Sequence, residues 1–316
     1  MSPRLGVWGL ILAVATGTVL WMGAAGLRFD WPSAAVTFGT CLLLEALAFT
    51  YRTLRPEPRI AATLGGLVQV IAFGACAAPL SYAVASTAGP LWDTTFAGWD
   101  RSLGLDWRAY LAFVDAHPRL GFAMTVAYRS LMVQMMLVIV LLGFCGRLTA
   151  LRQFVLAFCL SGTVTVLMSG LTPAMANFVH LQLGPADFPH LRPAAAFAHV
   201  SHLTGLRDGT LRTVSLDAIE GIITFPSFHA TSGALFLWAF WALPAARLPA
   251  LVLNVLLVAS TPIDGGHYFV DVAAGLLVAG LAILAARRFT PRPAQAAPPA
   301  SVPERGAGVA ALGAAR

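Results

Sequence analysis

The chain has 316 residues, of which 58% are hydrophobic and only 11% are charged. Soluble domains carry about 25% charged residues, so this composition excludes an ordinary soluble enzyme and predicts a polytopic membrane protein. The net charge is +6 and every basic residue is arginine, but no basic patch interleaved with aromatic residues lies on a soluble segment, so nucleic-acid binding is not indicated.

Apolar windows long enough, or nearly so, to cross about 30 Å of hydrocarbon recur along the chain. They cover residues 5–27, 33–51, 60–87, 121–145, 151–171, 228–245, 248–263 and 267–287. We therefore expect an all-α transmembrane bundle of about eight spans. Residues 1–119 would form N-terminal helices and an interfacial outer segment, and residues 120–288 the catalytic unit. Residues 289–316, rich in Pro, Ala and Gly, would form a disordered cytoplasmic tail.

The arginines are distributed unevenly between the two sides of such a bundle. With eight spans, the side of the termini carries twelve arginines against two acids, and the other side carries eight against eleven. The positive-inside rule then places the termini in the cytoplasm. The chain would be an integral protein of a bacterial inner membrane whose outer loops face the periplasm or the outside.

Two outer loops are long. Residues 88–120 contain Trp92, Trp99 and Trp107 among four aspartates, which is typical of an interfacial segment with its indole rings at headgroup level. Residues 172–227 contain four histidines, which we interpret as scattered surface residues rather than metal ligands. Pro193 predicts a helix start and a helix through Ala194–Leu203, and we expect this loop to cover the site.

Isolated reactive groups within the apolar windows receive structural interpretations. Glu45 is a lone intramembrane carboxyl, for which we expect a hydrogen bond within the bundle. The four cysteines are predicted to be inert buried thiols; they are Cys41, Cys76, Cys145 and Cys159.

The first segment that carries chemistry is His267-Tyr268-Phe269-Val270-Asp271, at the start of the last window. Positions i and i+4 of a helix share a face, so the Asp271 carboxylate can accept the Nδ1–H of His267 and leave Nε2 as a nucleophile. A capped helix start with a polar pair, or part of a metal site, is the alternative.

The second segment is Phe225-Pro226-Ser227-Phe228-His229, before the window at 228–245. Ser227 is a plausible N-cap, and the amides after it would form a phosphate site at a helix N-terminus. His229 could protonate a leaving oxygen, although simple capping with an interfacial histidine is the alternative. Two windows separate the segments, so both return to one membrane face, as a shared site requires.

These two segments together resemble the type-2 phosphatidic acid phosphatase superfamily of membrane lipid phosphatases. The matching residues are Phe225–Ala230 and Gly266–Val272, and Leu206-Arg207-Asp208 resembles a further element of the branch that contains inositol phosphorylceramide synthase and its bacterial relatives. The resemblance covers about residues 120–287 and implies a six-helix catalytic core with added N-terminal helices. It also implies that His267 attacks phosphorus, Asp271 orients it, His229 transfers protons, and Ser227, Phe228 and nearby amides hold the phosphoryl oxygens.

The sequence departs from the phosphatase pattern at two cationic positions. Thr261 stands where an arginine is expected before the nucleophile, and Pro185 stands where a lysine is expected before Arg192-Pro193. Another cation must then offset phosphate charge, for which Arg207 is the first candidate and Arg129 the next, ahead of Arg212. Asp264 either caps or turns the chain or binds an acceptor hydroxyl.

The sequence therefore predicts an enzyme that transfers a phosphoryl or phosphoryl-headgroup unit from a phospholipid or lipid phosphate at the outer membrane face. A transferase of the inositol-phosphoryl type, acting in sphingolipid or phospholipid metabolism, is favoured. The acceptor would be a lipid or polyol hydroxyl; with water as acceptor the protein would be a phosphatase. The scheme needs no metal and no cofactor. A non-catalytic lipid transporter or scramblase on the same bundle is a third possibility.

Overall fold

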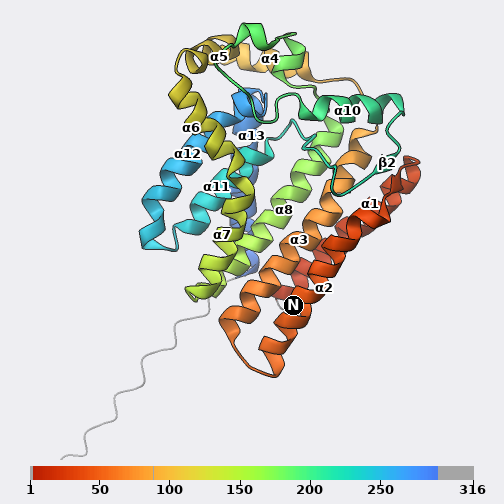
Figure 1. Ribbon diagram of the computed structural model, residues 1–316, viewed down its shortest axis with the longest axis vertical. Coiled ribbons are helices and arrows are strands. Elements are labelled where there is room, and N and C mark those ends of the chain that lie inside the picture. Colours follow the sequence, from red (N-terminus) through yellow and green to blue (C-terminus); the bar gives the residue numbers. More distant parts are fainter. Residues whose placement is uncertain (1–2, 88, 291–316) are drawn as a thin grey trace, which may run out of the picture.

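The computed structural model describes residues 3–87 and 89–290, which form a helical bundle capped at one end (Figure 1). Within these residues, six helices are long and apolar enough to cross a membrane, and one bent pair raises the number to seven. The chain is therefore an all-α integral membrane protein, which confirms the prediction from composition. All of the expected tail except residues 289 and 290 lies outside the described residues.

The N-terminal part of the bundle consists of three long helices and the helix that supports them. They are α1 (Pro3–Ala24), α2 (Trp31–Thr53), α3 (Pro58–Ala85) and α8 (Leu148–Leu171). Helices α1 and α2 both pack on α3, which packs on α8. Glu45 forms an ion pair with Arg52, two turns further along the same face of α2, so the carboxyl has a partner within its own helix.

Helices α6 (Pro118–Arg129) and α7 (Leu131–Phe144) form the bent pair, with an angle of 53° between them. The bend lies at Ser130, whose amide and hydroxyl both donate to the carbonyl of Ala127, at 3.2 and 2.6 Å. This tighter i to i−3 pattern interrupts the α-helical ladder. As a result α6 packs on α12, while α7 packs on α3 and α11.

The C-terminal part contains α11 (Phe228–Phe240), α12 (Arg247–Asp264) and α13 (Phe269–Phe289). Helix α11 has 13 residues, or about 20 Å at 1.5 Å per residue, and is too short to span the hydrocarbon. The prediction of a span over residues 228–245 is therefore wrong; Pro244 opens a short 3₁₀ turn, Pro244–Ala246, and the chain reverses there. Helix α11 packs against both α12 and α13.

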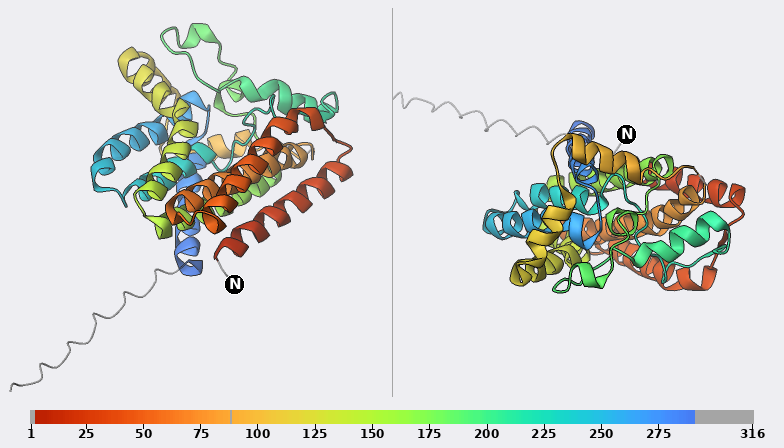
Figure 2. Two further views of the ribbon diagram at one scale, coloured as in Figure 1. Left: turned by 60° about the horizontal axis from the view of Figure 1, so that its bottom comes forward. Right: turned by 90° about the horizontal axis from the view of Figure 1, so that it is seen from above.

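Four short helices gather at the end of the bundle where α13 begins (Figures 1 and 2). They are α4 (Asp93–Ser102), α5 (Trp107–Asp115), α9 (Asn177–His180) and α10 (Ala198–Asp208), with a 3₁₀ turn at Pro185–Asp187. Nearby, β1 (Arg28–Phe29) pairs in parallel with β2 (Thr213–Val214). The described start of α1 and the end of α13 lie at the other end of the bundle.

Two expectations for the outer loops are wrong in detail. Helix α10 begins at Ala198 rather than Ala194, because the amides of Ala194 and Ala195 donate instead to the Asp264 carboxylate and carbonyl. Trp107 does not present its ring at the surface: it is 5% exposed and its indole N–H faces the carbonyls of Pro262 and His267, each at 3.2 Å.

Candidate active site

His267 and Asp271 are in contact and almost completely enclosed. His267 Nδ1 lies 3.2 Å from Asp271 Oδ2, and the side chains are 6% and 0% exposed. In the tautomer with its hydrogen on Nδ1, the ring donates to the carboxylate and Nε2 keeps a free lone pair. The predicted pairing is therefore present, in the arrangement that orients a nucleophilic imidazole.

The pairing arises from a helix cap rather than from a helix face. Helix α13 begins only at Phe269, so His267 precedes the helix. Asp271 Oδ2 also accepts from the Tyr268 amide at 2.9 Å, and Gly266 has a φ of +70°, which bends the chain back toward the cap. One carboxylate oxygen thus starts the helix and orients the histidine.

Two further aspartates, both on α4, hold the start of α13. Asp100 accepts from the amides of Phe269 and Val270, each at 2.9 Å. Asp93 accepts from the Tyr268 hydroxyl at 2.9 Å and from the Met175 amide. Burial raises the pKa of Asp100, while the two amide bonds oppose the rise. The first amides of α13 are consequently occupied by protein groups and are not open to a ligand.

Ser227 is the N-cap of α11, as predicted. Its hydroxyl accepts from the Ala230 amide at 3.3 Å, and the residue is 0% exposed. The next two amides, those of Phe228 and His229, donate no hydrogen bond to any described residue. Unpaired amides are usual in the first turn of a helix. The Phe228 ring packs edge-on against Phe158, so only its backbone faces the site.

A close approach of two helices joins the two segments. The Ser227 amide donates to the Asp271 carbonyl at 3.0 Å, and the Thr231 hydroxyl donates to the Gly275 carbonyl at 2.9 Å. A Cβ on Gly275 would lie 2.4 Å from the Ser227 carbonyl oxygen. Glycine at this position therefore permits the contact that brings the predicted residues together.

His229 is linked to His267 through a residue that the sequence analysis did not single out. The Tyr128 ring stacks on the His229 ring at 3.9 Å with an interplanar angle of 8°. A Cβ on Gly265 would lie 2.9 Å from the Tyr128 hydroxyl and 3.1 Å from His267 Nε2. Both histidines therefore lie around Tyr128 and the bare backbone of Gly265. In sequence, Tyr128 looks like an ordinary core aromatic residue.

The three candidate arginines differ in their surroundings. Arg129 ends α6 next to Tyr128, is exposed, and makes no hydrogen bond or ion pair within residues 3–87 and 89–290. Arg207 donates to the Gly89 carbonyl at 2.8 Å, and its second terminal nitrogen is buried without a partner in the described part of the chain. Arg212 donates to the carbonyls of Gly209 and Ala25 and so ties a loop to the end of α1.

Asp264 and Thr261 are both buried and already bonded. Asp264 Oδ1 accepts from the Thr125 hydroxyl at 2.8 Å and from the Ala194 amide at 3.1 Å, so it joins α6, α12 and the covering loop. The Thr261 hydroxyl donates to the Leu257 carbonyl within α12. Asp264 therefore makes the structural contacts of a turn, and Thr261 supplies no cation.

The loop histidines do not converge on one point. His190 contacts Asp115, His202 contacts Tyr82, and His199 Nε2 lies 3.1 Å from the Met175 carbonyl. The interpretation of His199 as a surface residue is wrong, because it is 4% exposed. No group of three or more His, Cys, Asp or Glu side chains placed to hold a metal ion occurs among the described residues.

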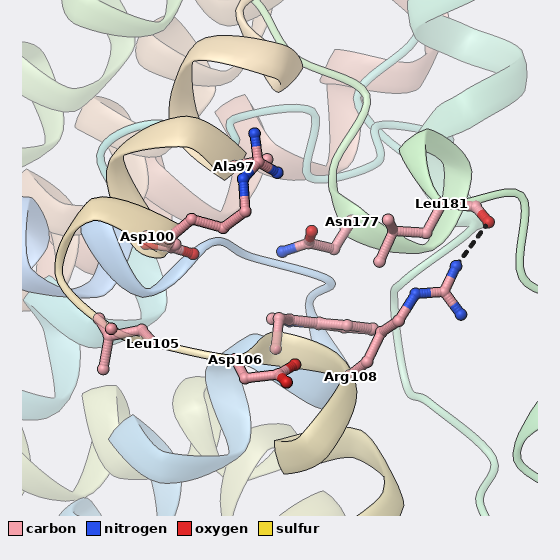
Figure 3. Close-up of a pocket in the computed structure, with 10 residues that line it drawn as sticks. Ala97, Asp100, Leu105, Asp106, Arg108, Asn177 and Leu181 are labelled. Atoms are coloured by element: carbon pink, nitrogen blue, oxygen red, sulfur yellow. Dashed lines mark hydrogen bonds between the residues drawn. The ribbon is translucent and has the colours of Figure 1, made fainter.

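A cavity of about 500 Å³ opens between α4, α5 and α9, beside the turn that carries His267 between α12 and α13 (Figure 3). Its lining includes Trp107 and Asn177, whose side-chain N–H groups face the His267 carbonyl at 3.2 and 3.3 Å. Arg108, also in the lining, reaches toward the Leu181 carbonyl. The same residues thus wall the cavity and hold the backbone of His267.

Comparison with known proteins identifies the family of the chain. The family model described as the PAP2 superfamily matches residues 94–285, which is more than half of the chain and includes α4, α5 and both site segments. The chain belongs to the PAP2 superfamily of phosphatase-type membrane enzymes. No curated protein and no solved structure matches it.

Proposed function

We propose that the protein is a lipid phosphotransferase or phosphatase that works through a phosphohistidine on His267. The observation that carries the proposal is the enclosed His267–Asp271 pair, joined by a backbone hydrogen bond to the segment that bears His229. Membership of the PAP2 superfamily supports the same chemistry.

In the first step, the Nε2 lone pair of His267 attacks phosphorus, and the bond from phosphorus to the leaving oxygen breaks. His229, as an imidazolium, gives its proton to that oxygen. Asp271 keeps Nδ1 protonated and offsets the positive charge that develops on the ring. In the second step, His229 takes a proton from the acceptor hydroxyl, whose oxygen attacks phosphorus and releases His267. The scheme uses no metal ion and no cofactor.

Phosphate charge would be offset by groups around α11 and the bend between α6 and α7. Ser227 fixes the turn that leaves the Phe228 and His229 amides free to donate to phosphoryl oxygens. Arg129 is the better placed cation, because it has no hydrogen bond or ion pair with the described residues and follows the residue that stacks on His229. Arg207 remains a second candidate, and Asp264 would act on an acceptor hydroxyl only if the Thr125 contact opened.

A transferase is favoured over a hydrolase, with an inositol-phosphoryl unit as the transferred group and a lipid or polyol hydroxyl as the acceptor. The loss of the phosphatase arginine at Thr261 supports this preference. The start of α1 and the end of α13 lie at one end of the bundle (Figures 1 and 2), and the excess of arginines around that end supports cytoplasmic termini and a site that faces the outside of a bacterial inner membrane. The donor would be a phospholipid or lipid phosphate drawn from the bilayer.

The test follows labelled phosphorus. Purified protein in lipid micelles is given phospholipids labelled at phosphorus, with and without diacylglycerol, ceramide or a polyol, and His267→Ala is run in parallel. Label in a new lipid or polyol identifies a transferase, and label in free phosphate identifies a phosphatase. Loss of either product in His267→Ala is expected. Lipid movement across vesicles that is insensitive to His267→Ala would instead support a transporter.

A further inference from the structure

We infer that Tyr128 is a further catalytic residue, whose hydroxyl donates a hydrogen bond to the phosphoryl group while it is transferred. The inference rests on the proposed function and names one more part of the same site. Tyr128 lies beside both proposed catalytic histidines: its ring stacks on His229, and its hydroxyl and His267 Nε2 both lie within about 3 Å of the position that a Cβ on Gly265 would take.

The ring of Tyr128 is fixed, which fixes its hydroxyl. The residue is 6% exposed, and the ring is stacked on His229 with centroids 3.9 Å apart. Such a contact leaves the phenol little freedom to rotate away. Tyr128 also lies one residue before the end of α6, next to the bend at Ser130, so its position is set by the packing of α6 on α12.

The hydroxyl has no other structural task in the described chain. It makes no hydrogen bond to residues 3–87 or 89–290, whereas the nearby Tyr110 hydroxyl donates to the Ala259 carbonyl at 2.7 Å and the Tyr268 hydroxyl donates to Asp93. The Tyr128 hydroxyl is not among the fully buried polar atoms that lack a partner in the described part of the chain, so it faces accessible space. A ligand oxygen in that space could accept its hydrogen bond.

The space beside the hydroxyl is the space that the reaction needs. A single carbon atom added to Gly265 would lie 2.9 Å from the hydroxyl, 2.7 Å from Cδ2 and 3.1 Å from Nε2 of His267. The Tyr128 hydroxyl and His267 Nε2 are therefore no more than about 6 Å apart. A phosphoryl group that entered between them could accept a hydrogen bond from the phenol while its phosphorus approaches Nε2. Glycine keeps the point free of side-chain atoms.

The chemistry also fits the departure from the family pattern. Thr261 replaces an arginine that would stabilise the transferred group, and preorganised neutral donors in a water-poor site can stabilise such charge strongly. The phenol keeps its proton throughout: the bond to the leaving oxygen breaks, the bond to Nε2 forms, and Tyr128 O–H only donates to a non-bridging oxygen. No additional reactant is needed.

The test compares Tyr128→Phe with Tyr110→Phe. Both changes remove one hydroxyl and keep the ring, but only the first removes the proposed donor. Tyr128→Phe should lower kcat about 10²-fold, as expected for the loss of one oxyanion donor, with little change in KM. Tyr110→Phe should keep kcat within about threefold, because the hydroxyl it loses is bonded to the Ala259 carbonyl within the protein and is not the proposed donor. Thermal unfolding of both variants checks that the fold is intact.

A second measurement uses orthovanadate, which forms a five-coordinate adduct that resembles the transferred group. Calorimetry in micelles should show at least about tenfold weaker binding to Tyr128→Phe than to wild type, unchanged binding to Tyr110→Phe, and none to His267→Ala. Equal vanadate affinity in wild type and Tyr128→Phe overturns the role of Tyr128 and leaves the phosphohistidine proposal standing. Wild type that neither binds vanadate nor turns over any donor overturns both.

Discussion

The backbone amide of Ser227 donates a hydrogen bond of 3.0 Å to the carbonyl of Asp271. Together with the hydrogen bond from the Thr231 hydroxyl to the Gly275 carbonyl, this contact joins the start of α11 to the first turns of α13 and so fixes His229 relative to His267. It depends on Gly275, because any larger residue on α13 would collide with the Ser227 carbonyl. The geometry of the site therefore rests on a close helix contact rather than on the catalytic side chains alone.

Gly275→Ala tests this dependence. Its Cβ would lie 2.4 Å from a backbone oxygen that cannot rotate away, so the helices must separate. We expect a loss of about 1–3 kcal/mol in the free energy of unfolding, together with most of the activity. Gly280→Ala on the same helix meets no atom within 4 Å and should be neutral or stabilising. Equal melting temperatures and activities for the two variants would contradict the account.

Gly265→Ala tests whether the space between Tyr128 and His267 must stay empty. The backbone at Gly265 has φ −99° and ψ −9°, which alanine adopts without strain, so any loss is steric. We expect kcat to fall at least about 10²-fold, because a misplaced reacting group costs that much. Gly221→Ala, in open space on the loop before α11, is the control. Wild-type turnover in Gly265→Ala would show that the reaction occurs elsewhere.

Asp271→Asn separates orientation from capping. The amide oxygen of asparagine can still accept a hydrogen bond from the Tyr268 amide and cap the helix. It carries no negative charge, so it cannot hold His267 in the Nδ1–H tautomer as the carboxylate does. We expect kcat to fall by about 10³–10⁴ while the melting temperature changes little. Steady-state kinetics and thermal unfolding are measured on the same preparation. Retention of more than about a tenth of the activity would argue against the orienting role.

His199 should make stability depend on pH. Burial, the largest effect, lowers the pKa of His199. The Met175 carbonyl raises that pKa in part and His267 lowers it further, and the net shift is downward. A histidine whose folded pKa lies below its unfolded value of about 6.5 must lose its proton to fold, so its cost appears as pH falls below that value. His199→Gln, which keeps an N–H donor for Met175, should therefore lose less melting temperature than wild type between about pH 7.5 and about pH 5.5. Parallel melting curves would exclude His199 as a source of acid sensitivity.

The sequence predicted which two residues pair at the site, but not how the fold builds the pairing. His267 and Asp271 were expected to pair across one helix face, but His267 precedes α13 and the pairing comes from a cap. Spacing in a sequence gives the separation of two residues and not the residue at which a helix begins. That start depends on Asp100, which lies far away in the chain.

The other wrong or missing predictions have a common cause: contacts between residues distant in the chain determine whether a side chain is buried or lies at the site. Trp107 was predicted at the membrane surface because residues 88–120 combine tryptophans with aspartates. In the structure it is buried and its indole N–H faces the His267 carbonyl. His199 was predicted on the surface and is buried over the Met175 carbonyl. Tyr128 gave no signal, because one aromatic residue on an apolar helix has no pattern that distinguishes a core position from a site. The apolar windows did predict the all-α membrane bundle, since that follows from composition alone.

The most direct test of the central claim is to trap the labelled covalent intermediate on His267. Protein is mixed with a phosphorus-labelled donor lipid, quenched within the first turnover in alkaline detergent, and assayed for protein-bound label. The account predicts label on wild type and on His190→Ala, an exposed histidine that contacts Asp115 at the outer surface, and none on His267→Ala. Label retained by a folded His267→Ala protein would contradict the phosphohistidine mechanism.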